Sequence, residues 1–315
     1  MTNEAMALEI DRRREELNAI ILAHNYQEPD IQDVADYVGD SLGLSQEAAE
    51  TDSDVIVFCG VRFMAETAKI LNPNKIVVLP DINAGCSLEE SCPPDRLAAL
   101  QSTNPNFCTI AYINCSAEVK ALSYCICTSG NAAKVVLAAP KDKDILFVPD
   151  ENLGQWVIEQ TGRPMTLWKG NCYVHNEFKH DQILKLHQQF PDAQVIVHPE
   201  SPREVRELAD IVCSTAKMVD YCKSSQAHYF IVVTESGIIH KMKKECPDKQ
   251  FICVPEFNTK QIPTANCRCS ECKYMKMNTL QKLYDCMLNL NPRIELSEDI
   301  LRLARIPIER MLKIV

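Results

Sequence analysis

Short runs of β-branched and other apolar residues alternate along the chain with longer stretches in which apolar residues recur at helical spacing. The runs predict strands over residues 19–23, 54–58, 75–79, 107–113, 144–148, 165–168, 194–197, 229–233 and 250–254. An alternation of strands with amphipathic helices is typical of layers built on parallel sheets. The pattern therefore predicts an α/β fold.

Three of the predicted strands end at a titratable residue, and the chain after each end follows the same plan. These ends are His24, Tyr112 and His198, and a hydroxyl residue stands 17 residues after each, at Ser41, Ser129 and Thr215. A fourth strand of each copy ends 56 or 57 residues after the same anchors. Chance among ordinary α/β segments explains one such agreement, but several together favour a threefold repeat.

We therefore expect three tandem α/β/α units of the Rossmann-like kind, each with a parallel sheet. They are expected over residues 1–98, 99–186 and 187–280, followed by a C-terminal helical segment over 281–315. Ligands bind where the carboxyl ends of parallel strands open into loops. If the three units turn these ends toward a common centre, the loops create one central site in place of three peripheral ones.

Several proton-transfer groups lie at these strand ends. They are His24, Tyr26, Tyr112, His175, His198 and Glu200. A lone histidine or tyrosine is usually structural, but several titratable groups that converge beside a metal are typical of an active site.

The charge balance limits the partners of the protein. A formal net charge of -10 disfavours binding to nucleic acid or to an anionic membrane, because both need basic patches. Residues 1–17 lack the apolar region of a signal peptide, and no apolar run approaches the length of a membrane span. We expect a cytoplasmic protein that binds small anions locally.

The three recurring hydroxyls provide such local sites. Ser41, Ser129 and Thr215 are each predicted to stand where a helix begins, and free N–H groups at helix N-termini bind phosphate and carboxylate. One Ser or Thr at a helix start is usually only an N-cap, but the recurrence favours anion binding. The chain lacks the glycine-rich fingerprints of dinucleotide and nucleoside triphosphate sites.

Sixteen cysteines are unusual for a protein of a reducing compartment, where disulfide frameworks are rare. Five lie in strand-like apolar runs and are interpreted as buried hydrophobes: Cys59, Cys125, Cys127, Cys213 and Cys253. Cys86 and Cys172 stand 62 and 60 residues after their anchors, and the third unit has an insertion here that ends in Cys267, Cys269 and Cys272. Each unit can thus contribute one thiolate from the same structural position.

Three hypotheses fit these thiols. Three thiolates around one centre can hold three corners of a cubane iron–sulfur cluster and leave the fourth iron open to a substrate. Zinc bound by Cys267, Cys269, Cys272 and a histidine is the competing metal hypothesis, although the spacing departs from the paired Cys-x₂-Cys knuckle. A redox switch through a disulfide between Cys269 and Cys272 is the third. Cys267 and Cys269 are equally well explained as plain loop thiols.

A set of longer motifs resembles the quinolinate synthase family from about residue 19 to residue 312. The motifs lie at residues 22–27, 60–69, 84–86, 116–121, 127–132, 147–150, 168–175, 198–200, 234–235 and 275–280. The resemblance implies three α/β/α domains related by pseudo-threefold symmetry around a central active site. It also implies a [4Fe-4S] cluster ligated by Cys86, Cys172 and Cys272.

The resemblance further implies a reaction and roles for the central residues. Such enzymes condense iminoaspartate with dihydroxyacetone phosphate into quinolinate for NAD biosynthesis, with the open iron acting as a Lewis acid. L-Aspartate oxidase, the source of iminoaspartate, is the implied partner. The proton-transfer residues would be Tyr26, Tyr112, His198 and Glu200. The residues that position intermediates would be His24, Asn114 and His175, and those that hold carboxylates and phosphate would be Ser41, Ser129 and Thr215.

The residue types at Cys115, Ser201 and Cys213 differ from those usual in the family. These differences concern local loop geometry. Two other functional classes also use the same cysteines. A cluster-dependent dehydratase of another small acid would need the same open iron and anion sites. An iron–sulfur redox sensor would not explain the hydroxyls and the proton-transfer groups.

Overall fold

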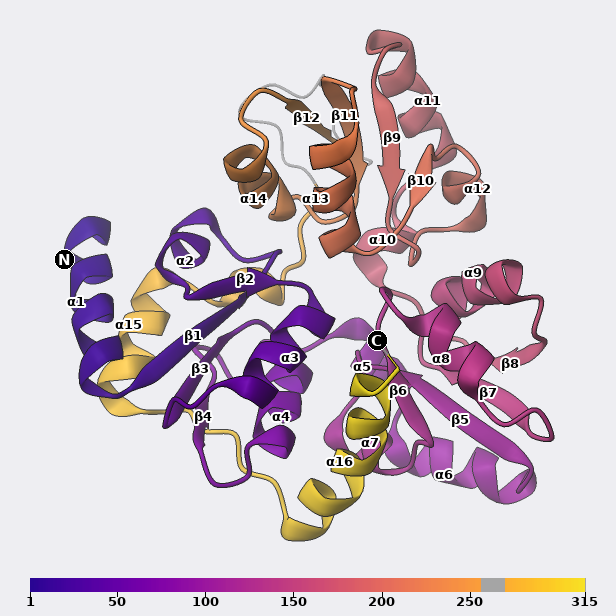
Figure 1. The fold of residues 1–315 in the computed structure, drawn as a ribbon, viewed down its shortest axis with the longest axis horizontal. Helices are drawn as coiled ribbons and strands as arrows, with labels where there is room; N and C mark the ends of the chain where they lie inside the picture. The colour runs from indigo at the N-terminus through magenta and orange to yellow at the C-terminus, as the bar shows by residue number, and fades with distance from the viewer. Residues whose placement is uncertain (256–269, 315) are drawn as a thin grey trace.

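The computed structural model describes residues 1–255 and 270–314, which form three lobes around a common centre (Figure 1). Each lobe contains one sheet of four parallel strands. The strand orders are β2-β1-β3-β4, β6-β5-β7-β8 and β10-β9-β11-β12. Since the same order recurs in all three sheets, the predicted fold of three α/β units is confirmed.

The first sheet is covered by helices on both faces. Its strands are β1 (Ala19–His24), β2 (Tyr37–Gly39), β3 (Val55–Cys59) and β4 (Ile76–Val78). One face packs against α1 (Asn3–Glu16), α2 (Pro29–Val34) and α15 (Leu280–Asn289), and the other against α3 (Ser41–Glu50) and α4 (Arg62–Leu71). Alternate residues of β1 supply the two faces: Ile21 and Ala23 belong to one core and Leu22 to the other.

The second sheet repeats this plan. Its strands are β5 (Phe107–Tyr112), β6 (Cys125–Cys127), β7 (Asp144–Val148) and β8 (Met165–Leu167). Helices α8 (Ala132–Ala138) and α9 (Glu151–Thr161) pack together over it, while α7 (Ala117–Ala121) packs with α6 (Pro94–Thr103) and α16 (Glu298–Leu312). Helix α16 also contacts α4, so the C-terminal segment joins the first two units.

The third sheet contains β9 (Gln194–Val197), β10 (Ile211–Val212), β11 (Tyr229–Val233) and β12 (Gln250–Cys253). Its helices are α11 (His180–Gln189), α12 (Arg203–Arg206), α13 (Thr215–Ser224) and α14 (Ile238–Glu245). The boundary predicted at residue 186 falls inside α11, whose Ile183 and Leu186 share a core with Val195 of β9. By its packing, α11 therefore belongs with the third sheet. The other unit boundaries stay a prediction.

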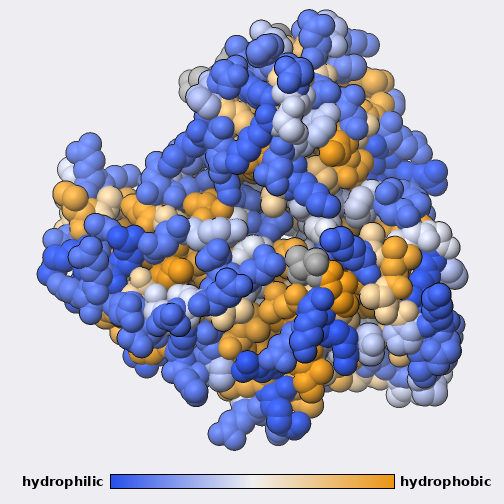
Figure 2. All heavy atoms as spheres, in the orientation of Figure 1, coloured by the Kyte–Doolittle hydropathy of each residue, from blue (hydrophilic) through white to orange (hydrophobic). Residues whose placement is uncertain are grey.

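Three short helices lie in the connections near the centre: α5 (Ser87–Ser91), α10 (Tyr173–Asn176) and the 3₁₀ helix η1 (Met275–Met277). None of the helices in the described ranges is long and apolar enough to pass through a membrane. Hydrophilic side chains dominate the rim of the face in Figure 2, and hydrophobic ones show below its centre, where α16 lies in Figure 1.

The apolar runs predicted the longer strands correctly. All nine predicted strands are present, with ends that shift by no more than a residue or two. Strands β2, β6 and β10 were not named from the pattern, because two or three residues at a sheet edge are too few to show an alternation. Cys59, Cys125, Cys127 and Cys213 are buried as predicted, but Cys253 in edge strand β12 is only partly buried.

At Gly237 the backbone of the third unit packs against the backbone of the first unit. A Cβ atom there would lie 2.8 Å from the Cα, C and O atoms of Tyr26. We expect Gly237→Ala to lower the free energy of unfolding by about 1–3 kcal/mol, because backbone atoms must move to admit the methyl group. Denaturant titration measures the change. Leu137→Ala, at a side chain that is 58% exposed, is the control, and equal stability of the two variants would contradict this contact.

Candidate active site

A central cavity lies where the three lobes meet. Twelve of the thirteen predicted site residues line it: His24, Tyr26, Ser41, Cys86, Tyr112, Asn114, Ser129, Cys172, His175, His198, Glu200 and Thr215. Asp40, Val61, Phe63, Met64, Thr128 and Met275 complete the lining. The remaining predicted residue, Cys272, is close enough to Cys86 and Cys172 to interact with them electrostatically. The structure thus brings together residues that are far apart in the sequence.

The first strands of the first and third units present their histidines in the same way. His24 ends β1, and its Nδ1 accepts the N–H of Tyr26 at 3.2 Å. His198 follows β9, and its Nδ1 accepts the N–H of Glu200 at 3.4 Å. Because Nδ1 accepts in both rings, Nε2 carries the proton of each neutral imidazole. The ring orientations therefore follow from the backbone turn after each strand.

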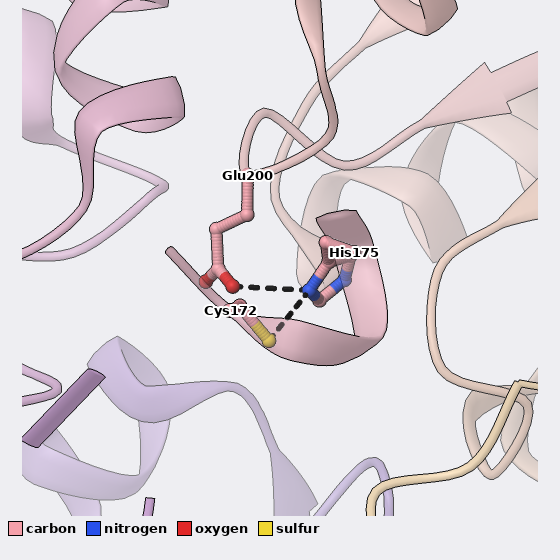
Figure 3. Close-up of side chains that lie close together, drawn as sticks. All are labelled: Cys172, His175 and Glu200. Carbon is pink, nitrogen blue, oxygen red and sulfur yellow. Dashed lines mark hydrogen bonds and ion pairs between the residues drawn. The ribbon is translucent and has the colours of Figure 1, made fainter. Parts of the chain in front are cut away.

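Glu200 is the centre of a buried hydrogen-bond network. Tyr112 donates its hydroxyl to Oε1 at 2.5 Å, and His175 Nδ1 lies 3.0 Å from Oε2 (Figure 3). Burial alone would raise the pKa of Glu200, but His175, His198 and the Tyr112 hydroxyl outweigh it and lower the pKa to about 2. The carboxylate is therefore ionised. Burial and the nearby carboxylate raise the pKa of Tyr112, so the phenol stays protonated.

The two strand-end histidines are neutral. Burial lowers the pKa of His24 and of His198 to about 3, against the opposing effect of Glu200. The cavity thus contains the ionised Glu200 carboxylate, the neutral imidazoles of His24 and His198, and the protonated phenols of Tyr26 and Tyr112. A dianionic ligand that enters this space adds negative charge, and negative charge raises the pKa values of nearby imidazoles and carboxylates. Bound substrate would therefore make these groups better proton acceptors.

The three hydroxyls lie on the cavity wall in two kinds of position. Ser41 and Thr215 are the first residues of α3 and α13, directly after the N-cap residues Asp40 and Ser214. Ser129 was expected to begin a helix, and this is wrong, because α8 starts only at Ala132. Ser129 instead occupies the turn between β6 and α8. In this turn Thr128 donates its N–H to the Asn131 side chain at 2.8 Å.

The three predicted ligand cysteines lie close enough to affect one another electrostatically. Burial raises the pKa of Cys86, Cys172 and Cys272, and the mutual repulsion of the thiolates adds to the effect for Cys86 and Cys172. A tetrahedral zinc site holds its sulfur atoms about 3.8 Å apart, since each Zn–S bond is about 2.3 Å. The three thiols are not among the described groups whose ligand atoms all lie within 4.8 Å of one another.

One described trio is compact enough for a single ion. The ligand atoms of Cys172, His175 and Glu200 all lie within 4.8 Å of one another, and His175 Nδ1 is 3.2 Å from Cys172 Sγ. Figure 3 shows these three side chains pointing toward one another. The site therefore contains residues that suit a metal cofactor. Cys272 is a free thiol, while the predicted zinc ligands and switch residues Cys267 and Cys269 lie outside the described residues.

Two hydrogen-bonding side chains outside the cavity lining, Asp150 and Thr234, were also not predicted as site residues. Thr234 directly follows β11 and bonds both Tyr26 and His175. Asp150 caps α9 after β7, is fully buried, and has a pKa that burial and nearby Glu200 raise. Both had entered only as parts of longer motifs. The available signal was their position, since each follows a central strand as His24 does.

The fold and the cavity together define a class of protein. Three α/β units that converge on thiols, imidazoles, phenols and a buried carboxylate are typical of an enzyme whose site suits a metal cofactor. The comparison with known families agrees. The family model described as quinolinate synthetase A protein matches residues 8–313, and the chain belongs to this family.

Individual relatives give the same result. The chain is 54% identical over 304 residues to the quinolinate synthase of Gloeothece citriformis, covering 96% of this chain and 92% of that one. It is 53% identical over 304 residues to that of Trichormus variabilis, with the same coverage. For the quinolinate synthase of Synechocystis sp. the identity is 54% over 303 residues, covering 96% and 93%. The resemblance found in the motifs is confirmed.

The neutral histidines predict how stability depends on pH. An unfolded histidine has a pKa near 6.5, so between about pH 3 and pH 6.5 the unfolded chain binds more protons than the folded one. The free energy of unfolding therefore decreases as the pH is lowered through this window. The loss between pH 7 and pH 5 is on the order of 2 kcal/mol for each of His24 and His198. Glu200 adds a loss only below about pH 4.5, since its folded pKa is about 2.

Denaturant titrations at pH 7 and pH 5 check this. We expect His198→Gln to lose less stability than the parent protein over this range. The replacement His187→Gln, which removes an exposed imidazole of α11, is the control. If His198→Gln lost as much stability between pH 7 and pH 5 as the parent protein, the neutral state of His198 would be contradicted.

Proposed function

We propose that this chain is a quinolinate synthase that condenses iminoaspartate with dihydroxyacetone phosphate into quinolinate, phosphate and water. Membership of the family supports this reaction. The observation that carries it is the meeting of Tyr26, Tyr112, His198 and Glu200 beside Cys86 and Cys172 in one cavity. Condensation and loss of water need several proton transfers at one place, and four such groups line it.

The cofactor in this proposal is a [4Fe-4S] cluster held by Cys86, Cys172 and Cys272. When bound, it supplies a Lewis acid at the iron that no cysteine ligates. The protein prepares each ligand separately. Backbone N–H groups of Leu88 and Glu89 stabilise the Cys86 thiolate, and Glu235 Oε1 accepts the Cys272 N–H at 3.1 Å. Such contacts orient ligands before the metal binds.

The proton-transfer roles follow from the hydrogen bonds. Tyr112 is the proton donor at Glu200, and the ionised Glu200 carboxylate is the acceptor toward Tyr112 and His175. His198 can accept a proton once a bound dianion raises its pKa. Tyr26 is a second phenolic donor, from the first unit. His24, His175 and Asn114 orient the intermediates, and the buried Asn114 Oδ1 has no hydrogen-bond partner among the described residues.

Anion binding in this proposal relies on backbone amides. Thr215 stands at the N-terminus of α13, where Ser214 makes no side-chain cap bond and the N–H groups and helix dipole attract phosphate and carboxylate. At α3 the Asp40 side chain accepts the N–H groups of Leu42 and Gly43, so Ser41 contributes its hydroxyl. Ser129 adds a hydroxyl from the turn before α8. An acidic protein can thus bind dianionic substrates without a basic surface. Cytoplasmic location and supply of iminoaspartate by L-aspartate oxidase remain parts of the proposal.

An anaerobic assay of the iron-reconstituted protein tests the reaction. With iminoaspartate and dihydroxyacetone phosphate we expect quinolinate and phosphate in equal amounts, because one phosphate leaves for each ring formed. Chromatography and phosphate detection measure both. A fully reconstituted protein that forms no quinolinate would reject the proposal. Turnover of another hydroxy acid would indicate a dehydratase, and a stable cluster without turnover would indicate a redox sensor.

Single replacements test the cluster ligands. Cys86→Ala, Cys172→Ala and Cys272→Ala are each expected to lose most of the bound iron and sulfide together with activity, since each removes one thiolate. An anaerobic iron and sulfide count measures the loss. Cys286→Ala is the matched control, because this buried cysteine lies in α15, away from the cavity. A full iron complement in any of the three variants would overturn the assignment of that ligand.

A further inference from the structure

The Thr234 hydroxyl lies between two active-site side chains that come from the other two units. Its Oγ1 is 2.6 Å from Tyr26 Oη, at the end of β1 in the first unit. It is also 2.8 Å from His175 Nε2, which belongs to α10 of the second unit. Thr234 itself follows β11 of the third unit and is 2% exposed. One hydroxyl therefore joins all three units.

These hydrogen bonds connect four side chains in sequence. Glu200 is a carboxylate that can only accept, so His175 Nδ1, at 3.0 Å, donates to it. Thr234 Oγ1 has one hydrogen, so it donates to at most one of its two partners, Tyr26 Oη and His175 Nε2. Tyr26, Thr234, His175 and Glu200 therefore form one continuous hydrogen-bonded chain.

Lys276 holds the backbone of Tyr26, and Glu235, the residue after Thr234, holds Lys276. Lys276 Nζ donates to the Tyr26 carbonyl at 2.9 Å and pairs with Glu235 Oε1 at 3.2 Å. Glu235 Oε2 in turn accepts the Gly237 N–H at 2.7 Å. The main chain of Tyr26 is therefore positioned without Thr234. What Thr234 adds is a fixed direction for the phenol.

We propose that Thr234 is a positioning residue that aligns the Tyr26 phenol and the His175 imidazole for the proposed reaction. This inference rests on the proposed function. Tyr26 and His175 both line the cavity, whereas Thr234 is not among the lining residues, so it acts through them. Among the described residues, Thr234 is the hydrogen-bond partner of Tyr26 Oη. Without it, the phenol has no fixed direction toward the substrate.

Two replacements separate the hydroxyl from the shape of the side chain. Thr234→Val keeps the shape and removes the hydroxyl, and we expect kcat to fall about 10- to 100-fold, as for other outer partners of metal-site groups. The KM values should change much less than kcat, because the residues that hold the substrate are unaltered. Thr234→Ser keeps the hydroxyl and should restore most of kcat. Both proteins should retain the iron and sulfide content of the parent.

Thr109→Val is the matched control. Thr109 is also a strand threonine that is 2% exposed, but its hydroxyl bonds Gln101, away from the cavity, so kcat should be unchanged. The role of Thr234 is overturned if Thr234→Val keeps the parent kcat, if Thr234→Ser loses as much as Thr234→Val, or if Thr234→Val loses its iron. A parent protein that forms no quinolinate would instead reject the proposed function, and this role with it.

Discussion

The structure depends on the burial of one carboxylate. Glu200 is 3% exposed, and an ionised carboxylate is stable at such a place only when its oxygens are hydrogen-bonded. Its partners, Tyr112 and His175, come from the second unit, while Glu200 comes from the third. His175 then reaches the first unit through Thr234 and Tyr26. The same network therefore links the three units and positions the proton-transfer groups.

Burial also makes the thiols at the same centre costly to ionise. Burial raises the pKa of Cys86, Cys172 and Cys272, so deprotonation of all three is costly until a cation is present. Metal binding would remove this cost and release protons, and it would couple the metal to the assembly of the units. The backbone N–H of Cys272 donates to the buried Glu235 carboxylate, and that of Cys172 bonds the buried Asp150 carboxylate. Buried carboxylates therefore position the backbone of two of the three cysteines.

The pattern of apolar residues predicted much of the fold, and the particular failures have physical causes. The long central strands are buried on both faces, so they appear as unbroken apolar runs. Edge strands such as β10 are too short for such a run. The start of α8 was misplaced because Asn131, three residues after Thr128, organises the turn through its side chain. Local propensity does not reveal a contact of this kind.

The sequence by itself determined the three α/β units, the spacing of the anchors and twelve of the eighteen residues that line the cavity, because strand periodicity and loop position are local properties. The tertiary structure decided which groups act together. That Thr234 connects Tyr26 with His175, and that Glu200 stays ionised while His24 and His198 stay neutral, depends on distances and burial across the three units. Electrostatic and hydrogen-bond energies depend on separations in space, and residue spacing along the chain does not specify them.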